Sequence, residues 1–174
     1  RTLWFGGVGR EAGRDPYFAH YYRAGLDGGE VQLLTPENAN HDITVAKDGK
    51  RFVDVHSTTT APPVVVVRDA DGRQLVELAR TDIARLQATG WVAPEDFVVK
   101  ARDGKTDVYG LLFKPSHFDA GKKYPIVTYI YPGPQVGSVG KRGFAAARGD
   151  HQALAELGFV VIALDGMGTP LRSK

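Results

Sequence analysis

The segment with the greatest chemical potential is a Tyr-, Pro- and Gly-containing run that follows an apolar stretch. Ile126–Tyr131 predicts a strand buried on both faces, and Pro132-Gly133-Pro134-Gln135 comes directly after it. The prolines have no amide hydrogen, so the available donors are the amides of Gly133 and Gln135 and the hydroxyl of Tyr131. Donors that converge at a strand end can stabilise the oxyanion of an acyl-transfer reaction. Alternatively, Tyr131 only packs beneath a rigid Pro-Gly turn.

The sequence contains no convincing nucleophile for such a reaction. Enzymes of the α/β-hydrolase type carry their nucleophilic serine in a Gly-x-Ser-x-Gly turn between a strand and a helix. Only one serine, Ser138, has flanking glycines, and Val136 occupies the position of the first glycine in that motif. We therefore predict that Ser138 is a flexible loop residue, that the catalytic serine lies outside this sequence and that this chain alone is inactive.

Other kinds of chemistry find little support in the composition. The chain has no Cys, which excludes disulfides and thiolate metal sites but is compatible with periplasmic, secreted and cytoplasmic proteins alike. The histidines show no metal-ligand spacing, so we predict no metal and no other cofactor. We expect His20 and His56 at the surface or wall of strands and His151 in solvent. The net charge is +2 with scattered basic residues, and Phe159–Leu164 is too short an apolar run to cross a bilayer, so neither nucleic acid nor membrane is an expected partner.

The first part of the chain reads as short strands punctuated by Asp-Gly turns, which suit tight hairpins because the turn residues must tolerate positive φ. The predicted strands are Leu3–Val8, Tyr17–Ala24, Val31–Leu34, Ile43–Ala46, Arg51–Ser57, Val64–Arg68 and Leu75–Leu78. A β-propeller fits this order best. Propeller blades bury their faces against neighbouring blades, so residues 1–80 are predicted to be the end of a propeller with further blades upstream.

The remaining chain predicts a different architecture. Residues 81–91 are expected to form a connector helix after a Thr81 cap, and residues 92–174 the start of an α/β domain, which the family resemblance described below implies is the N-terminal, incomplete part of an α/β-hydrolase domain. In that part, a hairpin precedes the strand at Ile126–Tyr131, a helix at Ala145–Leu157 and a second apolar strand at Phe159–Leu164. A strand, crossover helix and strand build a parallel sheet. The predicted fold class is thus mixed β and α/β, with terminal propeller blades followed by the first strands and helix of the hydrolase domain.

Two motifs in order, YPIVTYIYPGPQ and LGFVVIALDGMGTPLRSK, resemble the start of the catalytic domain of prolyl oligopeptidase-type serine peptidases, in particular the dipeptidyl peptidase IV branch. The resemblance implies a β-propeller ahead of the hydrolase domain, a Ser-Asp-His acyl-enzyme mechanism, a peptide substrate and no cofactor, and it allows a homodimer of the full-length protein. It assigns the oxyanion role to Tyr131. It further places Gly133, Asp165 and Gly168 in the turns that shape the active site.

Two positions depart from the family pattern. Pro132 stands where Ala or Gly is more familiar, and Met167 stands where many relatives have Arg, whose planar guanidinium hydrogen-bonds in a way that Met cannot.

The substrate that the resemblance implies is a short peptide from which an N-terminal X-Pro or X-Ala dipeptide is released. An acylaminoacyl peptidase or oligopeptidase of the same clan, a non-catalytic binding relative and a self-contained β-rich binding module remain alternatives.

Overall fold

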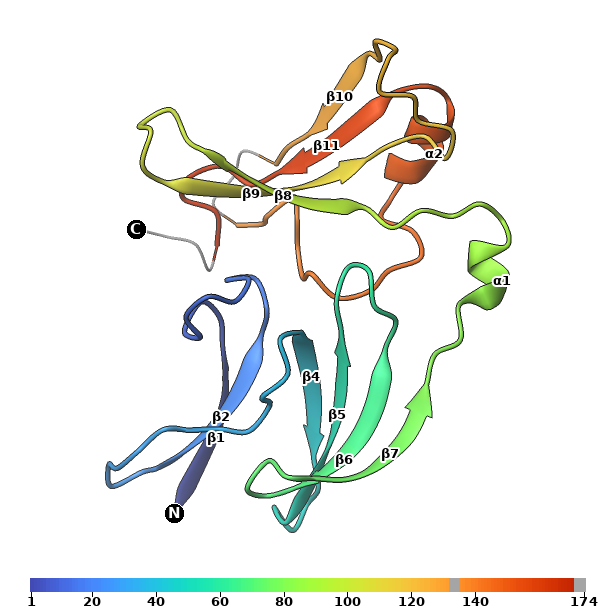
Figure 1. Ribbon diagram of the computed structural model, residues 1–174. Coiled ribbons are helices and arrows are strands. Elements are labelled where there is room, and N and C mark those ends of the chain that lie inside the picture. Colours follow the sequence, from blue (N-terminus) through green and yellow to red (C-terminus); the bar gives the residue numbers. More distant parts are fainter. Residues whose placement is uncertain (132–134, 171–174) are drawn as a thin grey trace. The chain divides into compact units, whose positions relative to one another are not determined.

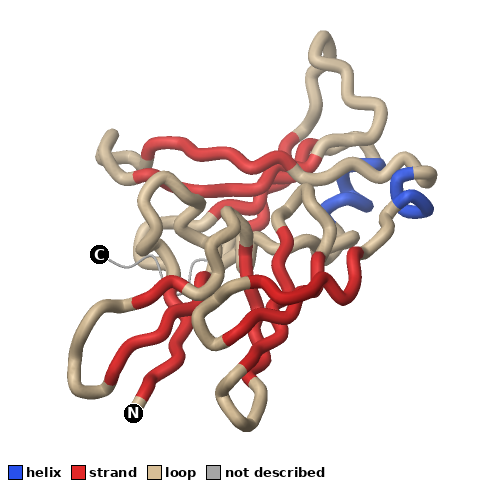
Figure 2. The backbone as a smooth tube through the Cα atoms, turned by 60° about the horizontal axis from the view of Figure 1, so that its bottom comes forward, coloured by secondary structure: helices blue, strands red, loops and turns tan. Residues whose placement is uncertain are grey.

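The computed structural model describes residues 1–131 and 135–170, and the chain separates into two compact units (Figures 1 and 2). Unit 1 comprises Arg1–Asp82 together with Lys141–Phe144. Unit 2 comprises Ile83–Gly140 together with Ala145–Lys174. Within the described residues, no helix combines the length and apolarity needed to cross a membrane.

Unit 1 is built of two antiparallel sheets. Its strands are β1 (Thr2–Gly7), β2 (His20–Gly25), β3 (Gln32–Leu33), β4 (Asn40–Val45), β5 (Arg51–Ser57), β6 (Val64–Asp69) and β7 (Gln74–Arg80). The orders are β1-β2-β3 and β4-β5-β6-β7, so within each sheet the strands pair in the order of the sequence (Figure 1). The short strands predicted for this region are therefore present, with ends shifted by a few residues.

The Asp-Gly turns of unit 1 form as their residue types predict. Gly49 and Gly72 both adopt positive φ, at 66° and 89°, and Asp48 accepts a hydrogen bond from the Lys50 amide. Gly72 has a second constraint, because a Cβ there would lie 2.6 Å from the carbonyl oxygen of Leu34. The β6–β7 turn is thus pressed against the segment between β3 and β4, and only glycine fits.

The core of unit 1 follows from the two-residue period of its strands. Alternate residues of β6 are buried, among them Val66, and the buried Arg68 of β6 pairs with Phe52 of β5. Phe52 also receives the edge of the Trp4 ring, with 5.5 Å between ring centroids. Tyr22 and Leu34 are also almost fully buried. These contacts hold the two sheets of unit 1 together.

Unit 2 contains one mixed sheet in the order β10-β11-β9-β8. Its elements are α1 (Ala84–Gln87), β8 (Glu95–Lys100), β9 (Asp107–Phe113), β10 (Ile126–Tyr129), α2 (His151–Glu156) and β11 (Val160–Leu164). β8 and β9 form the expected hairpin, β9 pairs antiparallel with β11, and β10 pairs parallel with β11. Because β10 and β11 are parallel, the chain must cross over between them, and α2 lies in that crossover.

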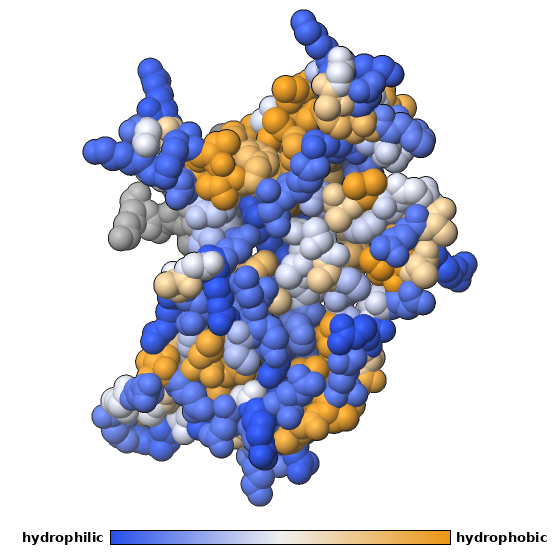
Figure 3. Space-filling view, in the orientation of Figure 1, coloured by the Kyte–Doolittle hydropathy of each residue, from blue (hydrophilic) through white to orange (hydrophobic). Residues whose placement is uncertain are grey.

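Three details of unit 2 differ from the sequence-based predictions. The helix expected from Ala145 begins only at His151, because Gly149 has a φ of +52°, outside the helical region. The connector helix is a single turn whose N-cap is Ile83, so the predicted Thr81 cap is wrong. β10 is not buried on both faces: it lies at the sheet edge, and Ile126 is 63% exposed. Figure 3 shows the resulting hydrophobic surface over this sheet.

Candidate functional site

Tyr131 lies two residues beyond the end of β10, and its backbone is held by a neighbouring loop. Tyr131 as a whole is 46% exposed. The Tyr131 amide donates a hydrogen bond of 2.6 Å to Oγ of Ser138. Gly133, the other residue predicted in this turn, lies outside the described residues.

Asp165 is the residue that organises this loop. It follows β11 directly, and its side chain is buried, with 4% of the residue exposed. Its Oδ1 accepts hydrogen bonds from the amides of Ser138 and Val139, the latter at 3.2 Å. Gly137 makes this approach possible, because a Cβ at that position would lie 2.9 Å from Oδ2 of Asp165. A carboxylate that accepts backbone amides fixes a loop more firmly than a neutral acceptor would.

The two sets of contacts join into a chain of hydrogen bonds from Asp165 through Ser138 to Tyr131. Parallel pairing of β10 with β11 brings their carboxyl ends to the same edge of the sheet, which is why residues so distant in sequence meet. Ser138 is therefore an anchored residue that bonds through both its amide and its hydroxyl, and the prediction of a flexible loop serine is wrong.

The turn after Asp165 contains the remaining predicted residues. Gly168 has a φ of +85°, which favours glycine, and Thr169 is buried with its hydroxyl donating to the Gly166 carbonyl at 2.8 Å. Met167 is 63% exposed, so its thioether replaces the familiar Arg without filling a core position.

His151, which was expected in solvent, is buried at the start of α2. Its ring meets the edge of Phe113 at 5.0 Å and approaches Tyr129 at 4.6 Å between centroids. Burial, assisted by the charge of Arg148, lowers the pKa of His151. The imidazole therefore packs as a neutral aromatic ring.

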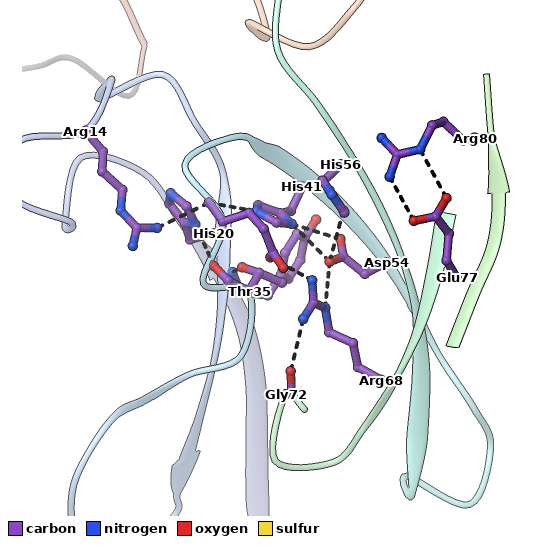
Figure 4. A network of polar contacts seen from close by, with 12 residues as sticks. Arg14, His20, Thr35, His41, Asp54, His56, Arg68, Gly72, Glu77 and Arg80 are labelled. Carbon is purple, nitrogen blue, oxygen red and sulfur yellow. Dashed lines mark hydrogen bonds and ion pairs between the residues drawn. The ribbon is translucent and has the colours of Figure 1, made fainter. Parts of the chain in front are cut away.

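A second concentration of polar groups lies inside unit 1, and the sequence analysis did not anticipate it. His41 and His56 are direct partners across β4 and β5, and Asp54 lies two residues before His56 on the same face (Figure 4). Nδ1 of His41 lies 2.9 Å from Oδ1 of Asp54, and Nε of Arg68 donates to Oδ2 at 2.8 Å. Arg68 also donates through Nη2 to Glu37 at 2.6 Å.

Opposing effects set the ionisation of this network. Burial alone would raise the pKa of Asp54, but the contacts with His41 and His56 and the hydrogen bond from Arg68 outweigh it and hold that pKa well below its usual range. The pKa of Glu37 is lowered in the same way, chiefly through its hydrogen bond with Arg68. Asp54 therefore carries its charge although its side chain is fully buried.

His20 adds a third imidazole to the network. It is 2% exposed, so its predicted surface position is wrong, and its ring lies 5.3 Å from that of His41. Nδ1 lies 3.0 Å from the Thr35 carbonyl oxygen, and burial lowers the pKa of His20. His56 is only partly buried, with 16% of its side chain exposed, which is closer to the expected wall position.

The chain is similar in sequence to known proteins over most of its length. No family model matches the sequence. Human dipeptidyl peptidase 8 is 30% identical over 151 residues, which cover 83% of this chain and 17% of the relative. Dipeptidyl-aminopeptidase B of Aspergillus niger is 25% identical over 159 residues, covering 88% of this chain and 17% of the relative. The chain is a homologue of the dipeptidyl peptidases. Both alignments also show that it spans about 17% of the length of these relatives.

The fold agrees with that relationship. The crystal structure of Porphyromonas gingivalis dipeptidyl peptidase 4 superimposes with a TM-score of 0.79 at 22% identity, covering 99% of this chain and 24% of that chain. The sequence relatives confirm the resemblance to dipeptidyl peptidases that the two motifs predicted, and the structural comparison shows the shared fold. The largely β architecture with open sheets is likewise shared with a solved dipeptidyl peptidase structure.

Proposed function

We propose that this chain is part of a serine-type dipeptidyl peptidase that releases N-terminal dipeptides from short peptides. The observation that carries the proposal is the 30% identity with dipeptidyl peptidase 8 over 83% of the chain. An X-Pro or X-Ala amino terminus is the substrate class that the dipeptidyl peptidase IV branch implies. The chain includes no Gly-x-Ser-x-Gly motif, so the proposed mechanism needs a nucleophile that these residues do not supply.

The domain organisation that we propose places the end of a β-propeller at residues 1–80, a connector at 81–91 and the N-terminal part of an α/β-hydrolase domain at 92–174. The open antiparallel β4-β5-β6-β7 sheet supports the first assignment. The parallel pairing of β10 with β11 across a helix-containing crossover supports the last. Hydrophobic side chains left exposed on β8 and β10, such as Val98 and Ile126, are consistent with further elements covering this sheet.

In the proposed mechanism, the serine Oγ attacks the carbonyl carbon of the scissile bond while histidine accepts the serine proton. The carbonyl oxygen becomes an oxyanion, and the hydroxyl of Tyr131 donates a hydrogen bond to it. The tetrahedral intermediate then collapses, the amine leaves with the proton from histidine, and water hydrolyses the acyl-enzyme. The exposed position of the Tyr131 side chain beyond β10 supports this role, since the hydroxyl must reach substrate.

Asp165 and Ser138 would act through Tyr131 and not on the substrate. The Asp165 carboxylate accepts the Ser138 amide, and Ser138 Oγ accepts the Tyr131 amide, so both residues restrict where the phenol can go. Preorganised donors stabilise an oxyanion well because they need no reorientation during the reaction. Gly133 and Gly168 would shape the two turns on either side.

The proposal is tested by incubating the full-length protein with a peptide whose second residue is Pro and identifying the products by mass spectrometry. The expected product is the N-terminal dipeptide, and acetylating the peptide's amino terminus should prevent its release. Release of a single acetylated residue would instead identify an acylaminoacyl peptidase. Absence of any cleavage by a folded full-length protein would contradict an enzymatic role.

A further inference from the structure

The buried cluster in unit 1 brings together donor atoms that the proposed peptidase reaction does not use. One ring nitrogen from each of His41 and His56 and one oxygen of Asp54 all lie within 4.8 Å of one another. Nδ1 of His41 lies 2.9 Å from Oδ1 of Asp54, and Nδ1 of His56 lies 3.7 Å from Oδ2 of the same carboxylate. Donors bound tetrahedrally at about 2.0 Å from an ion are roughly 3.3 Å apart, so both nitrogens approach this carboxylate at distances close to those that such a site needs.

The surroundings of His41 favour a cation next to Nδ1. Its other nitrogen, Nε2, lies 3.1 Å from the carbonyl oxygen of Glu37, and a carbonyl can only accept. With the proton on Nε2, the lone pair of Nδ1 faces the oxygens of Asp54, which is repulsive unless a cation lies between them. A histidine that donates its second ring nitrogen to a backbone carbonyl is the usual arrangement in metal sites.

His56 offers the second nitrogen. Its Nδ1 is buried, and at 3.7 Å from Oδ2 of Asp54 it is beyond hydrogen-bond distance and makes no hydrogen bond. A buried polar nitrogen without a hydrogen bond is costly and requires an explanation. Because the His56 side chain is 16% exposed, it also provides a route by which an ion and its water ligand can enter.

The two carboxylates of the cluster can be balanced by one cation in addition to Arg68. Asp54 and Glu37 are both carboxylates, and the single guanidinium of Arg68 hydrogen-bonds to each of them. Arg14 donates to the backbone carbonyl of Glu37 and not to its carboxylate. Oδ2 of Asp54 is occupied by Arg68, which leaves Oδ1 as the oxygen that can bind an ion.

We propose that His41, His56 and Asp54 form a binding site for a divalent transition-metal ion, with Zn²⁺ as the expected occupant. Nδ1 of each histidine and Oδ1 of Asp54 are the protein ligands, and water completes the coordination. Two imidazoles and one carboxylate suit Zn²⁺, whereas Mg²⁺ prefers oxygen donors alone. Since the site joins β4 to β5 inside unit 1, its role is to brace this sheet, and it does not depend on the proposed peptidase activity.

The test is isothermal titration calorimetry of the metal-free full-length protein with Zn²⁺. A second titration uses Co²⁺, and the visible absorption of the protein solution is recorded. The wild type should bind one equivalent of Zn²⁺ that His56→Gln lacks, and it should show Co²⁺ absorption bands that this variant loses. His117→Gln, which alters an exposed histidine of unit 2, should bind as the wild type does. Mg²⁺ at equal concentration should not compete.

His56→Gln is a suitable probe because Nδ1 of His56 makes no hydrogen bond that the fold would lose. Its circular dichroism should match that of the wild type, and His56→Ala provides a second deletion of the same donor. If the wild type binds no Zn²⁺, or if both variants bind it as tightly as the wild type, the proposal is wrong.

Discussion

Replacing Ser138 with Ala tests whether a hydrogen bond to the backbone sets the catalytic position of Tyr131. The substitution removes the Oγ atom that accepts the Tyr131 amide at 2.6 Å but leaves the Ser138 amide on Asp165. A hydrogen bond of this kind is worth about 1 kcal/mol net, and water can replace the acceptor because Tyr131 is exposed. We therefore expect kcat of the full-length enzyme to fall by up to about fivefold, since about 1.4 kcal/mol corresponds to a factor of ten.

The magnitude has an upper bound, because a complete loss of one oxyanion donor costs about a hundredfold to a thousandfold. KM should change little, since the loop positions a group that acts on the transition state. Ser116→Ala serves as the matched control, because that hydroxyl bonds to Glu156 on the surface of unit 2. Steady-state kinetics on an X-Pro chromogenic substrate measures both constants.

A double-mutant cycle separates positioning from general damage to the fold. If Ser138 acts only through the Tyr131 hydroxyl, Ser138→Ala should have no further effect on kcat in a protein that already carries Tyr131→Phe. An equal fold-loss in both backgrounds, or a loss confined to KM, would refute the reasoning.

Two further predictions concern the stability of unit 1. Gly72→Ala should lower the free energy of unfolding measured with urea by about 1–3 kcal/mol, and by more than Gly49→Ala does. Both positions have positive φ, but only at Gly72 would a Cβ also press against the Leu34 carbonyl. Equal losses in the two variants would contradict the close approach. The pKa of Asp54 is depressed on folding, so its contribution is present above the unfolded pKa of about 3.9 and is lost as pH falls below it. The urea midpoint of unfolding should therefore fall when the pH is lowered below about 4. Asp54→Asn should be less stable than the wild type near neutral pH, and its urea midpoint should depend less on pH below about 4. If the midpoint of this variant falls with acidification as steeply as that of the wild type, Asp54 is not the source of the pH dependence.

The parts of the fold that local residue chemistry determines were predictable. Asp48-Gly49 specified its hairpin because glycine accepts the positive φ of the turn, and Gly158 ended α2 as expected. The start of that helix was not predicted, because Gly149 has helix formers around it and its positive φ arises from the path of the crossover. The exposure of β10 was also missed, since an apolar run does not reveal whether its strand lies at a sheet edge.

The polar sites depended on pairing between strands, which the spacing of residues along the chain does not display. The His41–Asp54–His56 cluster could have been found from the Asp48-Gly49 turn: pairing Val45 with Phe52 places His41 opposite His56 four residues further along. The hydrogen bonds of Ser138 and Asp165 could not be predicted from a local turn. They join the ends of β10 and β11, and only the parallel register brings them together.

The most direct test of the central claim is the kinetic comparison of Tyr131→Phe with the wild-type full-length protein, using an X-Pro chromogenic substrate. Tyr129→Phe is the matched control, since it removes a hydroxyl two residues earlier and keeps the ring beside His151. If Tyr131 donates to the oxyanion, Tyr131→Phe should lower kcat about a hundredfold to a thousandfold with KM nearly unchanged, and Tyr129→Phe should retain activity. An unchanged kcat in Tyr131→Phe would contradict the account.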